Sequence, residues 1–283
     1  MEIILGFILG IVASVIANII GFYTGNRIYS YFKARTHELR SILPFDLSKN
    51  KHIVLAYGSI PPINTLSTHT VEQGDLMALL KAHDIAQLIG KEKSLLVHDS
   101  LSISSSYELH TNIFTISGPK WNPVTRILLG RIGAPITFKK SPSKGINVKT
   151  TKMKHKEFYN CIKDNTKLPK VCYGVIFAGE VENNNGTKQE VLICAGASTL
   201  STNSCLLYLS QLSKSKIKVK QAQSKGLFKQ KKWGLLLQIE NRKSVDTMHT
   251  PLHENDVNIK IEKVFFQEDF LPSYSNVSYP NQI

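Results

Sequence analysis

The residues best placed to do chemistry lie in short loops that follow apolar runs of the chain. One loop reads TISGPKWNPVTR. Gly118 permits close approach of the backbone to a ligand, and Asn122 followed by Pro123 is typical of the start of a helix. Free N–H groups at a helix start bind anions, and Lys120 and Arg126 add positive charge. We expect a phosphate-bearing ligand here; the alternative is a well-capped turn without one.

Two further loops have a similar composition. The segment CAGASTLSTN carries one glycine and several hydroxyl groups, and it could cradle phosphate or simply precede a helix. The segment YGSIPP follows an earlier apolar run. Ligands collect at the carboxyl ends of strands in open α/β sheets, so the three loops form one cleft if their strands are neighbours. The predicted ligand-binding residues are Gly58, Ser59, Gly118, Pro119, Asn122, Thr125, Arg126, Gly196, Ser198, Thr199, Ser201 and Thr202.

The remaining reactive side chains form no catalytic pattern. Nine histidines are scattered without HExxH or HxH spacing, so we expect neither a metal nor a cofactor. Asp75 is interpreted as a helix cap, and Cys194 and Cys205 as packed thiols. The chain has no GxSxG, GxGxxG or Walker A segment. The catalytic residues therefore stay unknown, and the sequence leaves open whether the protein is an enzyme.

Strands alternating with helices would position these loops. Apolar runs bounded by Gly, Ser or Pro predict strands, and a period near 3.6 residues predicts helices. This alternation predicts an α/β, Rossmann-like domain with a mostly parallel sheet and helices on both faces. The predicted strands are 52–57, 94–97, 112–116, 173–178, 190–195, 233–239 and 258–266, and the predicted helices are 73–89, 123–132 and 203–212.

The start of the chain carries a different signal. Residues 3–24 contain no charge, and about 20 residues of helix cross a bilayer. No Lys or Arg precedes the run, which favours an uncleaved transmembrane anchor over a signal peptide. Basic residues after it predict a single-pass protein of the cell (inner) membrane, with the N-terminus outside and the C-terminal domain cytoplasmic. Small residues spaced by four (Gly6, Gly10 and Ser14) would allow a homo-oligomer through this transmembrane helix.

These patterns divide the chain into four predicted parts. They are a transmembrane anchor at 1–26, a basic juxtamembrane connector at 27–51, a cytosolic α/β domain at 52–270 and a tail at 271–283. Within the domain, residues 139–170 are interpreted as a lysine-rich insert without regular structure.

The net charge of +14 is concentrated in two segments. Residues 139–170 hold ten lysines against two acids, and residues 214–232 hold eight lysines and no acid. The lysines either form a solvated loop or attract an anionic membrane surface. Nucleic acid is the least favoured partner, because lysine outnumbers arginine and no nucleic-acid-binding motif is visible.

Two loop sequences resemble a family of little-characterised prokaryotic α/β domains. ISGPKWNPVT resembles the family's GGPxxNxxT loop, and VLICAGASTLSTNSCLLYL resembles its AGxxGT strand, loop and helix. Ser117 stands where the family has its first Gly, and Ser201 where it has the Gly before Thr202. The resemblance spans residues 52–212 and implies a Rossmann-like fold without an established reaction. The layout is also similar to nucleotide-sensing domains fused to membrane helices in bacterial defence effectors.

The sequence thus predicts a membrane-anchored cytosolic domain of the sensor or effector type. Its ligand would be a phosphate-bearing, nucleotide-like small molecule. One alternative is a membrane-tethered structural adaptor that contacts anionic lipid or partner proteins. A further alternative is a nucleotide-cleaving hydrolase.

Overall fold

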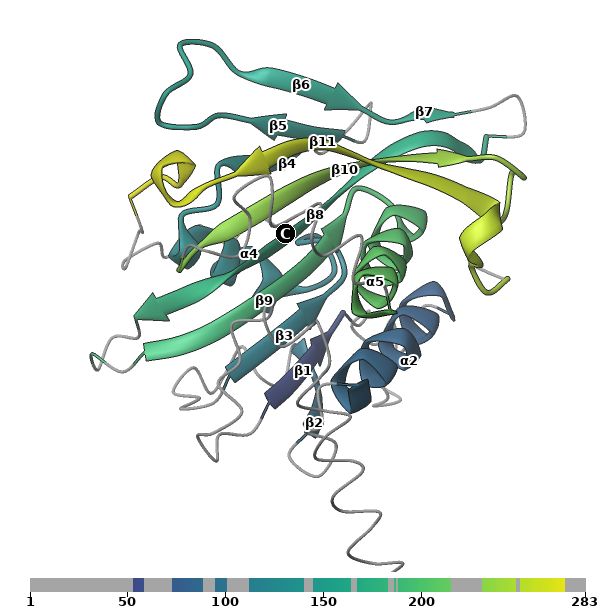
Figure 1. Cartoon of the computed structure of the whole chain (residues 1–283), viewed down its shortest axis with the longest axis horizontal. Coiled ribbons are helices and arrows are strands. Elements are labelled where there is room, and N and C mark those ends of the chain that lie inside the picture. Colours follow the sequence, from purple (N-terminus) through teal and green to yellow (C-terminus); the bar gives the residue numbers. More distant parts are fainter. Residues whose placement is uncertain are drawn as a thin grey trace, which may run out of the picture.

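Two sheets and three α-helices make up the described part of the chain (Figure 1). The structure, a computed structural model, describes residues 53–58, 73–88, 95–100, 112–139, 145–163, 167–182, 186, 188–214, 231–247 and 250–272.

The main sheet has eight strands in the order β11-β10-β8-β9-β3-β1-β2, with the short β7 paired to β8. It joins segments far apart in the sequence, since β3 lies between β1 and β9. The strands are β1 (Ile53–Tyr57), β2 (Leu95–Asp99), β3 (Asn112–Ile116), β7 (Ile162–Lys163), β8 (Pro169–Glu182), β9 (Lys188–Gly196), β10 (Trp233–Asn241) and β11 (Val257–Phe265).

One half of the main sheet is parallel. Strands β9, β3, β1 and β2 run in the same direction. Their side chains alternate between two buried clusters: Ile53 and Leu55 of β1 join one cluster, and Val54 and Ala56 join the other. A strand buried on both faces needs this continuous apolar run, which is why the sequence pattern predicted β1 and β3 well.

The other half is antiparallel, through β9, β8, β10 and β11. Only five residues separate β8 from β9, whereas a parallel connection needs a dozen or more. The prediction of a mostly parallel, Rossmann-like domain is therefore wrong. Strands take up 45% of the structure against 28% for helices, so β-structure dominates.

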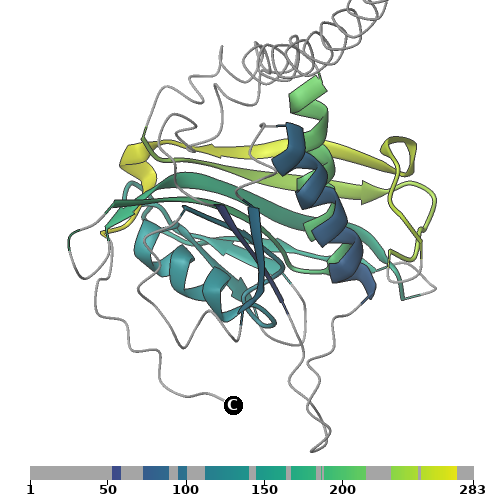
Figure 2. The same cartoon turned by 90° about the horizontal axis from the view of Figure 1, so that it is seen from below.

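Helices cover both faces of the main sheet. Helices α2 (Gln73–Leu88) and α5 (Thr199–Lys214) lie side by side on one face (Figure 2), where Ala78, Ala82 and Leu206 enter the first cluster. Helix α4 (Pro123–Ile132) belongs to the second cluster on the opposite face. Two 3₁₀-helices, η3 (Glu254–Asp256) and η4 (Gln267–Asp269), flank β11.

A small antiparallel sheet also covers the α4 face. Its order is β4-β5-β6, with β4 at Ile136–Lys139, β5 at Gly145–Val148 and β6 at Glu157–Asn160. Ile146 and Val148 are fully buried there. Residues 139–170, expected to be irregular, thus contain β5, β6, β7 and the start of β8. Strands β5 and β6 contain no lysine, and Lys149, Lys152, Lys154 and Lys156 lie in the connection between them.

The predicted single-pass membrane protein also needs correction. No helix among the described residues is long and apolar enough to cross a membrane, which runs against the predicted transmembrane helix and the predicted inner-membrane localisation. The anchor at 1–26 and the connector at 27–51, on which those predictions depended, lie outside the described residues.

Candidate functional site

Three loops meet at the carboxyl edge of the parallel strands. They are Gly58 after β1, residues 117–122 after β3 and residues 197–198 after β9, here called the edge loops. Because β1, β3 and β9 are adjacent and parallel, the predicted convergence of the loops is confirmed. Ser59 lies outside the described residues.

The edge loops also lie where the helices change sides. The helices that follow β1 and β9 pack on one face of the sheet, and α4, which follows β3, packs on the other. In open α/β sheets, ligands bind at the carboxyl ends of the strands where the helices change sides in this way.

Glycines allow the edge loops to approach one another closely. A Cβ added to Gly118 would lie 2.7 Å from the carbonyl oxygen of Gly196. One added to Gly58 would lie 3.1 Å from both the Cβ of Ser117 and the carbonyl oxygen of Trp121. The loops therefore form one packed unit in which larger residues would force the backbone apart.

Asn122 ties this unit together. Its Nδ2 donates to the carbonyl oxygens of Ile116 at 2.6 Å and Ala56 at 3.2 Å, and to Oγ1 of Thr115 at 2.9 Å. Its Oδ1 accepts the backbone N–H of Thr125 at 3.0 Å, so the predicted helix cap is confirmed. The side chain is fully buried, and its hydrogen bonds connect β1, β3 and α4.

Ser117 is the unusual residue of the site. Its φ is +84°, in the left-handed region that costs a non-glycine residue about 1–2 kcal/mol. The side chain is 1% exposed, and Oγ has no hydrogen-bond partner. Two other described non-glycine residues, Lys167 and Ser244, have positive φ, but both are exposed. A strained residue with an unsatisfied buried hydroxyl is an observation from which a functional site can be inferred.

The third loop leads directly into a capped helix. The N–H of Ser198 donates to Oγ of Ser201 at 2.9 Å, and the N–H of Ser201 donates to Oγ of Ser198 at 3.3 Å. This reciprocal pair is a capping box with serine in the usual Glu position. Helix α5 therefore begins at Thr199, four residues before the predicted start, and Ser201 and Thr202 are helical and not part of a loop.

The predicted site residues fall into two groups by exposure. Six are buried and form the inner side of the site: Gly58, Asn122, Thr125, Gly196, Ser201 and Thr202. The half-exposed or exposed group faces solvent, together with Lys120, whose Nζ lies 4.1 Å from the ring centroid of Trp121. That second group consists of Gly118, Pro119, Arg126, Ser198 and Thr199.

The start of α2 packs against the first turns of α5, directly after the third loop. A Cβ on Gly74 would lie 2.1 Å from Cγ2 of Thr199, and Nδ2 of Asn203 donates to the carbonyl oxygen of Gly74 at 3.1 Å. The neighbouring Asp75 is 6% exposed, within the first turn of the helix. No group of three or more His, Cys, Asp or Glu in the described ranges could hold a metal ion.

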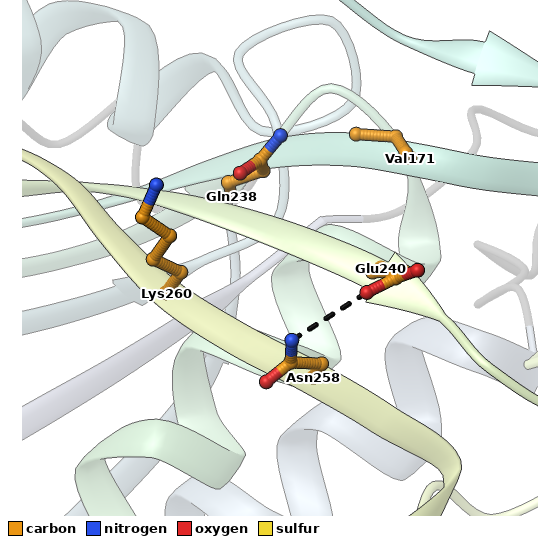
Figure 3. Close-up of a pocket in the computed structure, with 5 residues that line it drawn as sticks. All are labelled: Val171, Gln238, Glu240, Asn258 and Lys260. Atoms are coloured by element: carbon orange, nitrogen blue, oxygen red, sulfur yellow. Dashed lines mark hydrogen bonds between the residues drawn. The ribbon is translucent and has the colours of Figure 1, made fainter.

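A shallow pocket of about 260 Å³ lies elsewhere, on the antiparallel half of the sheet (Figure 3). The cross-strand partners Gln238 and Lys260 line it, as do Glu240 and Asn258, which share a hydrogen bond of 3.4 Å. Val171 supplies the one apolar side chain in its wall. No local pattern in the sequence indicates this pocket, because only the antiparallel register brings the four polar residues together.

No protein-family model matches the chain, and the search of curated proteins finds no match either. Any functional conclusion therefore comes from the geometry of the site.

Proposed function

We propose that the protein is a sensor- or effector-type domain that binds a phosphate-bearing, nucleotide-like small molecule at the edge loops. Ser117 carries the proposal, because its buried Oγ has no partner and lies on strained backbone beside the start of α4. Because Ser117 is 1% exposed, the edge loops must part for an anionic oxygen to reach this hydroxyl. Such an oxygen would satisfy the hydroxyl and would use the positive end of the helix dipole.

The surroundings of Ser117 suit an anion with several oxygens. Ser198 presents a half-exposed hydroxyl on the neighbouring loop, and Lys120 and Arg126 supply exposed positive charge. The half-exposed indole of Trp121 offers a flat apolar surface on which a base can stack, as bases do on aromatic side chains in nucleic-acid sites. This combination supports a nucleotide more than inorganic phosphate.

Equilibrium titration of the full chain with ATP and with pyrophosphate tests the proposal. Removal of the hydroxyl in Ser117→Ala should weaken binding about tenfold or more, since a hydrogen bond to a charged group contributes about 1.5–3 kcal/mol. The matched control is Ser244→Ala, which also removes a serine hydroxyl at positive φ but on an exposed loop. Equal affinities of the two variants would contradict the proposal.

The same titration separates the alternatives. Absence of binding by the wild-type chain would favour a structural adaptor, in which the edge loops only join the elements of the sheet. Release of inorganic phosphate or free base from ATP during the titration would favour a nucleotide-cleaving hydrolase.

A further inference from the structure

All four cysteines of the chain are reduced and pack in or against one cluster beneath α5. Cys172 of β8, Cys194 of β9 and Cys205 of α5 are fully buried. Cys161, between β6 and β7, is half-buried and packs against the same cluster. It is therefore the thiol that an oxidant in solution reaches first.

The strand register brings Cys161 and Cys172 together. Strand β7 pairs antiparallel with β8, with Ile162 opposite Val171. The register is irregular between Ile162 and Lys163, but extending the Ile162–Val171 pair by one residue would place position 161 across from position 172. Both side chains belong to or pack against the same buried cluster, and Cys161 contributes to the raised pKa of Cys172, which agrees with this placement. Cβ atoms of such opposite residues are about 4.5–5.5 Å apart, and a disulfide needs about 3.5–4.5 Å. Strand β7 has only two residues, so a small shift of this strand would bring the two Cβ atoms within disulfide distance.

The buried partner of this pair contacts a loop of the candidate site. Burial raises the pKa of the Cys172 thiol to about 12, and the nearby side chains of Ser198 and Ser201 offset part of that rise. These two serines form the capping box of α5. The backbone N–H of Ala197 also donates to the carbonyl oxygen of Tyr173 at 3.2 Å, next to Cys172.

We propose that Cys161 and Cys172 form a reversible cross-strand disulfide in exchange with a small-molecule disulfide such as glutathione disulfide. The Cys161 thiolate attacks one sulfur of glutathione disulfide and releases one glutathione. Cys172 then attacks the Cys161 sulfur of the mixed disulfide and releases the second glutathione. Two electrons pass from the protein to glutathione, and the two thiol protons end on the released glutathione molecules. The bond redirects the Cys172 sulfur away from Ser198 and Ser201.

The inference goes beyond ligand binding and is tested without a ligand. The reduced full chain is incubated with glutathione disulfide, its thiols are counted, and tryptic peptides are analysed without reduction. Two of the four thiols should disappear, and a linked pair of peptides, residues 157–163 and 171–188, should appear and be lost on addition of dithiothreitol.

Two variants sharpen the test. Cys161→Ser changes a half-buried residue and should abolish the linked peptides, whereas Cys194→Ala should retain them. Hydrogen exchange of the oxidised wild type should be faster at residues 197–202 than in the reduced protein, because the serines lose the Cys172 thiol. A glutathione adduct that remains on Cys161, a bond between two chains or a bond to Cys194 or Cys205 would overturn the proposal.

Discussion

At the scale of single residues, Ser117 and Asn122 do different things at the same edge. Asn122 satisfies its polar atoms within the fold, through four hydrogen bonds to strands and helix. Ser117 leaves its hydroxyl unsatisfied on strained backbone. The first residue stabilises the site, and the second carries a cost in stability that a ligand would offset.

Ser117→Gly should raise the free energy of unfolding by about 1 kcal/mol, because glycine tolerates positive φ and has no hydroxyl to bury. The same change should weaken phosphate binding. Urea unfolding measures the first effect, with Ser117→Ala as the control that removes the hydroxyl but keeps the strained backbone. A glycine variant no more stable than the alanine variant would show that strain at this position is negligible.

Asn122→Asp should be as destabilising as Asn122→Ala, and each should lower the free energy of unfolding by about 3 kcal/mol. Asp normally equals Asn as a helix cap, and it would keep the acceptor for the N–H of Thr125. Its second oxygen, however, would face two carbonyl oxygens and a hydroxyl in a fully buried place, where an unpaired charge is costly. Urea unfolding of both variants checks this. An Asp variant with wild-type stability would contradict the proposed role of the amide group.

The sequence predicts the cap at Asn122 but not the state of Ser117. Asn followed by Pro is a local signal, and the structure places the cap and the start of α4 as expected. Positive φ at a serine has no such signal, because it depends on how β1 and β3 pack beside one another. The one indication in the sequence is that Ser117 stands where the resembling family has a glycine, a residue that tolerates positive φ.

At the scale of elements, local sequence predicted α4 and β3 well and the β8–β9 pair poorly. The run NNNG between these strands favours a hairpin, but the alternation of strands and helices along the chain led to the prediction of a mostly parallel sheet. The start of α5 was missed because its Ser/Thr run resembles a loop. Those same hydroxyl groups form the capping box between Ser198 and Ser201.

The end of the β10–β11 hairpin should depend on pH through Asp256. A hydrogen bond from Lys243 at 2.9 Å, and a second from the N–H of His253, hold the pKa of Asp256 below its usual value of 3.8. A lowered folded-state pKa stabilises the fold above the unfolded pKa, and this contribution is lost as the pH falls through the folded pKa.

Asp256→Asn should therefore lower the urea midpoint at about pH 7, and its difference from wild type should shrink as the pH falls below about 4. Urea titrations of both proteins across this range give the comparison. A difference that stays constant with pH would mean that the carboxylate charge has no part in holding the hairpin end.

At the scale of the whole molecule, the mixed sheet explains how a mostly β structure has a candidate site at the carboxyl ends of parallel strands. The antiparallel half supplies most of the strand area, and the parallel half supplies the carboxyl edge with its change of helix sides. Long-range pairing of β3 with β9 creates the site, and no local pattern in the sequence encodes that pairing. The three loops were predicted to converge only on the assumption that their strands are neighbours in the sheet, and β1, β3 and β9 are neighbours.

The net charge of +14 attracts any anion, so a specific site must be distinguished from this general field. Lys120→Ala and Lys152→Ala each remove one positive charge. Lys120 lies in an edge loop, whereas Lys152 pairs with Glu268 at 3.3 Å on an exposed surface. At about 0.15 M KCl, where screening acts over about 8 Å, only the first should weaken pyrophosphate binding, by about fivefold. Calorimetric titration measures both, and equal losses would indicate general attraction.

The most direct test of the edge-loop site is a crystal structure of the protein soaked in tungstate, a tetrahedral dianion like phosphate with a strong anomalous signal. We predict an anomalous peak within hydrogen-bonding distance of the Ser117 hydroxyl, at the start of α4. Peaks confined to surface lysines, with Ser117 still unpartnered, would contradict the account.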